Sequence, residues 1–265
     1  CIVRCAQPLV GLAGHESTAD ETLFKQIERS NPSGAGLMVA DARPKANAIA
    51  NRGRKGGYED VSNYEESNTE LVFLNIDNIH VMRNSLEEMH ALLRDTERSN
   101  SHVKLSEVVA TGWLSFVGRL LGGAAKLVEV VGTQQRTVIV HCSDGWDRTA
   151  QLSALAQLCL DPHYRTSKGF AVLFQKEWQS FGHKCRDRTW GHKPHERSPI
   201  LFQFLDAVHQ IMYLCPEAFE FNELLLIRLT ELIYSNEFSD FRYNNERERL
   251  ESLHGRAAAL AQFSA

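Results

Sequence analysis

The stretch that decides the fold runs from Thr137 to Thr149 and reads Thr-Val-Ile-Val-His-Cys-Ser-Asp-Gly-Trp-Asp-Arg-Thr. Residues 137–141 are almost all apolar or β-branched, which predicts a short buried strand. Beyond the quoted stretch, apolar residues recur at helical spacing from Leu152 to Cys159 and predict a helix. The polar segment between them is therefore a loop at the junction of a strand and a helix.

The rest of the chain alternates short apolar runs with amphipathic segments. Strands are expected over 36–40 and 71–74, and the polar, glycine-bearing residues 42–69 predict a long loop. Helices are expected over 21–29, 78–93, 104–117, 119–131, 198–214 and 221–235. Short strands separated by helices indicate an α/β fold, with a mostly parallel central sheet, helices on both faces and extra helices after the loop. Because ligands bind beyond the carboxyl ends of such strands, the site is expected directly after Val140.

The composition is that of a globular chain large enough for one substantial α/β domain. Of the 265 residues, 43% are hydrophobic and 23% are charged, which excludes wholesale disorder. The net charge of −4 argues against a general nucleic-acid binder. Residues 141–200 nevertheless hold nine Lys and Arg against six Asp and Glu, and this local excess of positive charge suggests an anion site. No apolar run reaches the roughly 18 residues that a membrane span requires.

The cysteines indicate the inside of a cell. Six cysteines are scattered along the chain, too few and too dispersed for a disulfide framework. The sequence begins at Cys1 rather than Met, so we expect it to be an excised part of a longer protein.

The loop itself carries the chemistry of an anion-binding nucleophile. Five residues separate Cys142 from Arg148, a spacing that lets the intervening backbone N–H groups turn around one tetrahedral anion. Arg148 would hold two phosphate oxygens, and Gly145 permits the tight curvature. The same field favours the thiolate of Cys142 at neutral pH. The alternative is that Cys142 is only a small buried residue and Arg148 a surface residue.

Residues 141–149 resemble the signature of the myotubularin family of phosphoinositide 3-phosphatases, within the cysteine-dependent phosphatase superfamily. The resemblance covers about residues 1–245, which we expect to form one phosphatase domain with a cysteine-phosphatase-like fold. Residues 246–265 depart from the family and read as a polar, alanine-rich tail, helical or frayed. Further stretches that match the family are 5–9, 41–44, 51 with 56–59, 73–76, 78–83, 160–166, 176–184, 196–199 and 218–223.

The resemblance implies removal of the 3-phosphate from phosphatidylinositol 3-phosphate and phosphatidylinositol 3,5-bisphosphate, without a metal or other cofactor. Cys142 would attack phosphorus in line to form a cysteinyl-phosphate, while Arg148 and the loop amides stabilise the equatorial oxygens. Asp147 is the candidate for both donating a proton to the leaving oxygen and activating water. Asp144 is the rival for this role, and either carboxylate could instead only orient the loop or a ring hydroxyl.

The same resemblance implies the substrate-binding residues. Lys184 and Arg188 would lie over the pocket and bind a second phosphate or the phosphodiester, although a solvated basic turn is the simpler alternative. Trp146 would form a wall against the inositol ring or else anchor the core. The remaining residues expected to line the substrate are Asn51, Asn78, Ile79, Ser143, Asp144 and Gly145. Each asparagine could instead be a loop or helix cap.

Two further hypotheses concern the segment around Cys185. A reversible disulfide between Cys142 and Cys185 would make the nucleophile redox-sensitive. A zinc site from His183, Cys185, His192 and His195 is disfavoured, because the spacing is irregular and basic residues intervene.

Three functions remain open from the sequence: a phosphoinositide 3-phosphatase, a protein tyrosine or dual-specificity phosphatase, and an inactive lipid-binding scaffold. Retention of Cys142, Asp147 and Arg148 favours an active enzyme, and the paired cations Lys184 and Arg188 favour a lipid substrate. The expected partner is a phosphoinositide at a membrane surface, with no nucleic acid. The family further implies a cytoplasmic protein peripheral on endosomal membranes, and homo- or hetero-oligomers formed through regions outside this chain.

Overall fold

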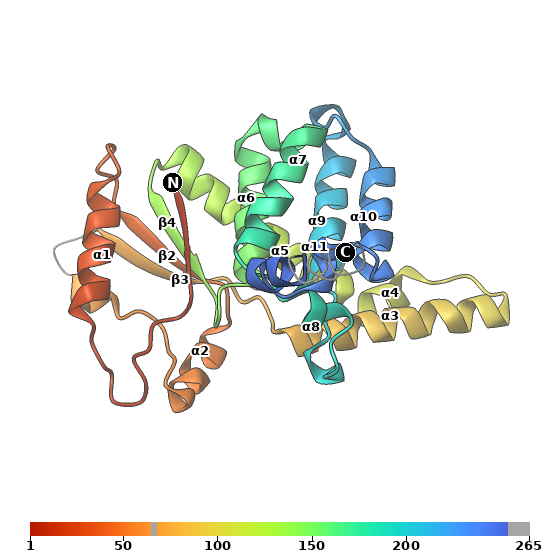
Figure 1. Ribbon diagram of the computed structural model, residues 1–265, viewed down its shortest axis with the longest axis horizontal. Helices are drawn as coiled ribbons and strands as arrows, with labels where there is room; N and C mark the ends of the chain where they lie inside the picture. Colours follow the sequence, from red (N-terminus) through yellow and green to blue (C-terminus); the bar gives the residue numbers. More distant parts are fainter. Residues whose placement is uncertain (65–67, 254–265) are drawn as a thin grey trace, which may run out of the picture.

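The computed structural model describes residues 1–64 and 68–253, and its centre is a four-stranded parallel sheet. The strands are β1 (Ile2–Cys5), β2 (Leu37–Asp41), β3 (Thr69–Phe73) and β4 (Thr137–His141), in the order β1-β4-β2-β3. Cys5 pairs in register with His141, and His141 with Asp41. The strands therefore end together at one edge, as Figure 1 shows. The expected parallel α/β fold is confirmed.

Helices cover both faces of the sheet, but unequally (Figure 1). One face packs mainly against α1 (Thr18–Arg29) through a small cluster that includes Phe24, Tyr64 and Ile139. The other carries most of the protein, including the expected helices after the loop. The helices before the phosphate loop are α3 (Ile79–Ser99), α4 (Leu105–Ala110) and α5 (Trp113–Val128), and those after it are α6 (Arg148–Leu160), α7 (Ser167–Phe174), α8 (Cys185–Thr189), α9 (Ile200–Leu214), α10 (Glu223–Ser235) and α11 (Ser239–Arg242).

The structure corrects two sequence-based expectations. Residues 42–69 are not one long loop, since they contain α2 (Lys45–Asn51) and short 3-10 turns at Arg52–Arg54 and Val61–Tyr64. Alanine is the strongest helix former, and three alanines support α2 despite its polar neighbours. The helices expected over 104–117 and 119–131 are instead divided at Gly112, whose φ of 75° interrupts the regular helix.

The edge strand β1 was missed altogether. Its four residues are too few for a recognisable alternation of apolar and polar positions, and all four are only half-buried. β1 becomes a strand because β4 supplies its hydrogen-bonding partner along the whole length.

The domain boundary near residue 245 stays a prediction. Residues 246–253 are helical, and the remainder of the predicted tail, 254–265, lies outside the described residues. None of the helices in the described part of the chain has both the length and the apolar character needed to cross a membrane.

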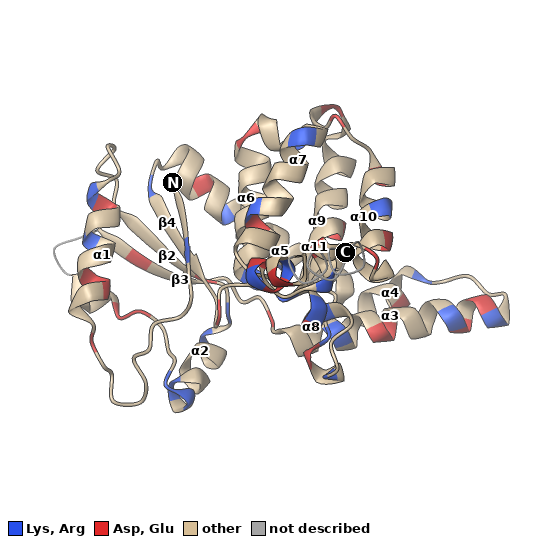
Figure 2. Ribbon diagram, in the orientation of Figure 1, with Lys and Arg blue, Asp and Glu red and all other residues tan. Residues whose placement is uncertain are grey.

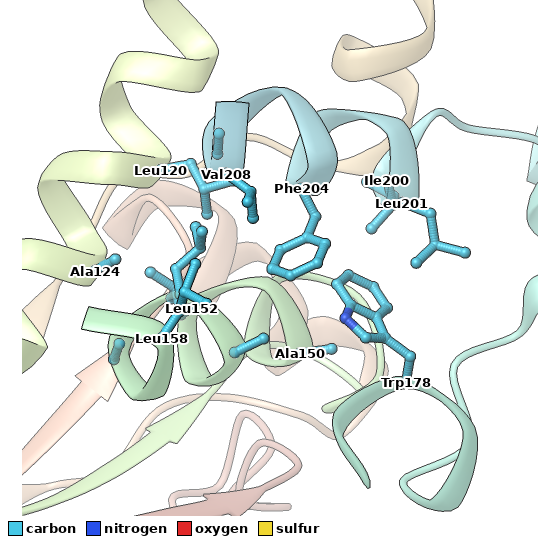
Figure 3. Packing of buried hydrophobic residues seen from close by; sticks show 14 of the residues in the cluster. Leu120, Ala124, Ala150, Leu152, Leu158, Trp178, Ile200, Leu201, Phe204 and Val208 are labelled. Carbon is cyan, nitrogen blue, oxygen red and sulfur yellow. The ribbon is translucent and has the colours of Figure 1, made fainter. Parts of the chain in front are cut away.

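α6 is the helix that carries the site, and it lies at the centre of the larger core. Most of its residues are buried, as expected of a helix packed on all sides. Figure 3 shows Leu152 and Leu158 of α6 near Leu120 and Val208, with Phe204 packed against Trp178. The strand before the loop and the helix after it are thus both held by core packing.

We predict that Leu152→Ala lowers the free energy of unfolding by about 2–5 kcal/mol, because it removes a fully buried side chain and leaves a cavity. Urea unfolding followed by circular dichroism measures this change. Leu214→Ala is the matched control, since Leu214 is 75% exposed and its truncation should change stability by less than about 0.5 kcal/mol. Equal effects of the two substitutions would contradict the central position of α6.

Candidate active site

The loop from Cys142 to Asp147 curls between the end of β4 and the first turn of α6. Gly145 adopts a φ of 86°, and a Cβ at this position would lie 2.7 Å from the carbonyl oxygen of Cys5. Only glycine therefore combines this backbone conformation with such a close approach to β1. The N–H of Gly145 donates to the Sγ of Cys142 at 3.3 Å. This bond and the N-terminus of α6 both direct positive electrostatic potential toward the sulfur.

Arg148 is a buried residue of the site and not a surface side chain, being only 8% exposed. Its guanidinium donates to the carbonyl oxygen of Ile76 at 3.1 Å and lies 3.5 Å from the Oγ of Ser143. The simpler interpretation of Arg148 as a solvated residue is therefore wrong. These contacts instead hold its planar guanidinium at the cavity that Arg148 lines.

Asp147 is paired with Arg188 by a two-point contact. The Nε and Nη2 atoms of Arg188 donate to the two carboxylate oxygens at 3.0 and 2.8 Å, and His183 Nδ1 lies 3.3 Å from Oδ1. Burial on its own would raise the pKa of Asp147, but His183 and Arg188 together hold that pKa well below its usual range. Asp147 is accordingly ionised in this arrangement, the opposite of what a proton donor needs.

Asp144 lies in a different electrostatic environment. Partial burial raises the pKa of Asp144, the negative charge of Asp147 adds to the rise, and Lys184, Arg188 and Arg148 oppose it. The two carboxylates of the loop thus have pKa values displaced in opposite directions. Pairs of this kind mark candidate acid and base roles.

The two predicted cations, Lys184 just before α8 and Arg188 within it, take different positions. Arg188 is buried, and besides Asp147 it binds the carbonyl and the carboxylate of Glu196, each at 3.0 Å. The ammonium of Lys184 lies 4.3 Å from the ring centroid of Trp146, a cation–π contact at the cavity wall. Lys184 is therefore the cation more available to a ligand, because Arg188 is already paired with Asp147 of the loop.

One cavity of about 890 Å³ brings the predicted residues together. Of those predicted, only Gly145 does not line it, because this glycine turns toward β1. The side chain of Asn78 accepts hydrogen bonds from the N–H groups of His80 and Val81. Asn78 is therefore the N-cap of α3 as well as a residue of the cavity wall. The predicted residues that line the cavity are Asn51, Asn78, Ile79, Cys142, Ser143, Asp144, Trp146, Asp147, Arg148, Lys184 and Arg188.

The sequence analysis missed two residues, in β1 and directly after it, that form hydrogen bonds with the phosphate loop. Arg4 donates to the carbonyl of Gly145 at 2.8 Å and forms a buried salt bridge of 2.7 Å with Glu177. Gln7 accepts from the side chain of Asn51 at 3.3 Å, and its backbone N–H donates to Ser143 at 3.1 Å. The only signal for these residues was a matched family stretch that includes Gln7.

His183 and Arg43 support the site from two other directions. The Nδ1–H of His183 donates to the carbonyl of Trp146 at 2.8 Å, and the ring of Trp178 packs edge-on against it. Arg43 forms a fully buried salt bridge of 2.7 Å with Asp41, at the end of β2, and lines the cavity. Both residues fall within matched family stretches, but only the structure assigns their partners.

The two hypotheses about Cys185 find little support in the structure. Cys185 is buried away from the cavity, and this burial raises the pKa of its thiol to about 12, which disfavours thiol–disulfide exchange. His183 is committed to Trp146 and Asp147, and no group of three or more potential metal ligands is found among residues 1–64 and 68–253.

Comparison with known proteins agrees with this geometry. The model of the myotubularin-like phosphatase domain matches residues 1–250. Myotubularin of Xenopus laevis is 47% identical over 252 residues, which cover 94% of this chain and 41% of that protein. Phosphatidylinositol-3,5-bisphosphate 3-phosphatase MTMR2 of Mus musculus is 44% identical over 252 residues, covering 94% of this chain and 39% of that protein.

A relative from an invertebrate gives the same result. Phosphatidylinositol-3,5-bisphosphate 3-phosphatase mtm-1 of Caenorhabditis elegans is 44% identical over 255 residues, 94% of this chain and 42% of that protein. The chain thus spans about two fifths of the length of these relatives. The family resemblance found in the sequence is confirmed, and the chain belongs to the family of myotubularin-like phosphatase domains.

Proposed function

We propose that this chain hydrolyses the 3-phosphate of phosphatidylinositol 3-phosphate and phosphatidylinositol 3,5-bisphosphate. The observation that carries the proposal is the loop geometry, in which the sulfur of Cys142 accepts a backbone N–H at the base of a cavity that Arg148 lines. The names of the MTMR2 and mtm-1 relatives support the choice of substrate. The substrate would be presented on a membrane surface, by a cytoplasmic protein peripheral on endosomes. Oligomers would form through regions beyond this chain.

The first chemical step forms a sulfur–phosphorus bond and breaks the bond between phosphorus and the inositol oxygen. Cys142 supplies the electron pair as a thiolate, and Arg148 with the loop N–H groups stabilises the charge on the equatorial oxygens. Water then attacks the cysteinyl-phosphate, which releases inorganic phosphate and restores the thiolate. Neither of these two reaction steps requires a metal ion.

The leaving oxygen requires a proton, and Asp147 remains our proposed donor. Arg188 holds Asp147 ionised through the two-point contact described above. A substrate phosphate that bound Arg188 would compete with Asp147 for the guanidinium, and the pKa of Asp147 would then rise toward the value that an acid needs. Asp144 is the alternative donor, because its pKa is already raised.

The charges of the cavity support a substrate with more than one phosphate. Five cationic side chains and three carboxylates line it. Cys142 and Arg148 would hold the 3-phosphate, which leaves Lys184 and Arg54 for a second phosphate or the phosphodiester. The ring of Trp146, held by the ammonium of Lys184, would then form a wall beside the inositol.

We predict that Cys142→Ser abolishes phosphate release from short-chain phosphatidylinositol 3-phosphate, with a loss of at least about 10³-fold, because a serine hydroxyl is not ionised at neutral pH. Phosphate release is measured at pH 7, with the 4-phosphate isomer and a phosphotyrosine peptide as control substrates. Unchanged thermal unfolding shows that the variant is folded. Faster release from the peptide than from the lipid would overturn the substrate assignment.

We further predict that Asp147→Asn lowers kcat by about 10²–10⁴-fold, because it removes the proton donor. Asp144→Asn is the matched variant from the same loop and should retain kcat within about tenfold, as expected of an orienting group. The pH profile of kcat distinguishes the roles, since loss of the donor abolishes the fall in rate at high pH. If only Asp144→Asn shows that change, Asp144 is the donor and our assignment is wrong.

A further inference from the structure

Two of the cationic side chains that line the catalytic cavity have no carboxylate partner in the described part of the chain. Arg43 and Arg188 each form an ion pair with an aspartate, and Arg148 belongs to the phosphate loop. The remaining two cations are Arg54 and Lys184. Positive charge that the protein does not itself neutralise attracts further negative charge on the ligand.

Arg54 is held at the cavity by a short turn that is attached to the phosphate loop. The turn covers residues 52–55 and follows Asn51, whose side chain donates to the Oγ of Ser143 at 3.1 Å. Two backbone hydrogen bonds of 3.0 and 3.1 Å close the turn. The backbone that carries Arg54 is therefore fixed relative to the loop that binds the 3-phosphate in our proposal.

The turn carries three cations, and Figure 2 shows their positive charge at the end of α2. Only Arg54 reaches the cavity. The guanidinium of Arg52 lies over the ring of Tyr58, 4.6 Å from its centroid, and Lys55 is exposed away from the cavity lining. Lys55 is therefore a matched control for Arg54, because it has the same charge and lies in the same turn.

Arg54 and Lys184 differ in their exposure and in the elements that carry them. Arg54 is exposed, whereas Lys184 is half-buried, with its ammonium 4.3 Å from the ring centroid of Trp146. Arg54 follows α2, which lies beyond the ends of the strands, and Lys184 precedes α8 on the side of the larger helical layer (Figure 1). A ligand bound at the phosphate loop would thus meet cations on two different walls, and Arg54 is the one nearer to solvent.

The proposed substrates offer negative charge besides the 3-phosphate. The phosphodiester at position 1 of the inositol ring and the phosphate at position 5 flank position 3, each one ring carbon further on. The 5-phosphate is attached to the ring alone. The phosphodiester is also joined to the acyl chains, which stay outside the protein, so it must lie where the cavity opens to solvent.

We propose that Arg54 binds the phosphodiester of the substrate and is a specificity residue for a 3-phosphate carried on a phosphatidylinositol headgroup. The more exposed cation lies where the phosphodiester has to leave the cavity. A guanidinium can donate to both non-bridging oxygens of a phosphodiester. This inference rests on the proposed function, because it assumes that the 3-phosphate occupies the loop between Cys142 and Arg148.

The test measures binding by isothermal titration calorimetry in the Cys142→Ser chain, which lacks the nucleophile. The three probes are inositol 3-phosphate, glycerophosphoinositol 3-phosphate and inositol 3,5-bisphosphate. The second probe adds only the phosphodiester and its glycerol to the first, and the third adds only the 5-phosphate. Arg54→Gln, Arg54→Lys and the control Lys55→Gln are compared in this background, and thermal unfolding shows that each is folded.

The Cys142→Ser chain should bind glycerophosphoinositol 3-phosphate at least about fivefold more tightly than inositol 3-phosphate, because charge-assisted hydrogen bonds to the phosphodiester add to the affinity. Arg54→Gln should remove this difference. It should leave the affinities for the other two probes within about twofold of those in the Lys55→Gln control. Arg54→Lys should keep part of the difference, since an ammonium supplies the charge without the fork, and Lys55→Gln should keep all of it.

Two results would overturn the inference. One is that the Cys142→Ser chain does not distinguish glycerophosphoinositol 3-phosphate from inositol 3-phosphate. The other is that Arg54→Gln chiefly weakens binding of inositol 3,5-bisphosphate, which would assign Arg54 to the 5-phosphate.

The proposed function is tested separately, by phosphate release from the same probes with Cys142 in place. Release without any preference for the phosphodiester would remove the inference alone. Selective binding that Arg54→Gln abolishes, without any release, would remove the proposed hydrolysis alone.

Discussion

The phosphate loop lies so close to the end of β1 that a side chain at Gly145 would meet the carbonyl oxygen of Cys5 at 2.7 Å. This constraint turns the N–H of Gly145 toward the sulfur of Cys142 and its carbonyl toward Arg4. Arg4 in turn forms a buried salt bridge with Glu177, next to the core residue Trp178. The nucleophile is thus positioned by contacts on both sides of the loop. These contacts hold the loop in its conformation before any substrate binds.

The charges of the site form one coupled system. Two carboxylates within the loop would repel each other and a phosphate, unless cations compensated them. Arg188 compensates Asp147 directly, whereas Asp144 lines the cavity and has a pKa that partial burial raises. A phosphate entering the cavity would compete with Asp147 for Arg188. In our proposal, substrate binding and the protonation of the loop are linked through this one guanidinium.

One edge of the sheet brings together the segments that build the site. Parallel strands end together, so the loops after β1, β2 and β4 are brought side by side. The loop after β4 holds the nucleophile, and the segment after β2 supplies Arg54 to the cavity. The loop after β1 supplies Gln7 to the cavity.

The strand, loop and helix around Cys142 could be predicted from the sequence alone, because the short apolar run, the Cys-x5-Arg spacing and the helical repeat follow one another directly along the chain. The sequence also sufficed for the parallel α/β class. The support of the loop by Arg4, Gln7 and His183 depended on tertiary structure, because their partners lie 36 to 173 residues away. So did the ionised state of Asp147, which is set by the approach of Arg188 across the fold. The pattern of residues along the sequence predicts which side chains can take part in catalysis. Their protonation states and their partners are set by hydrogen bonds and burial in the folded protein.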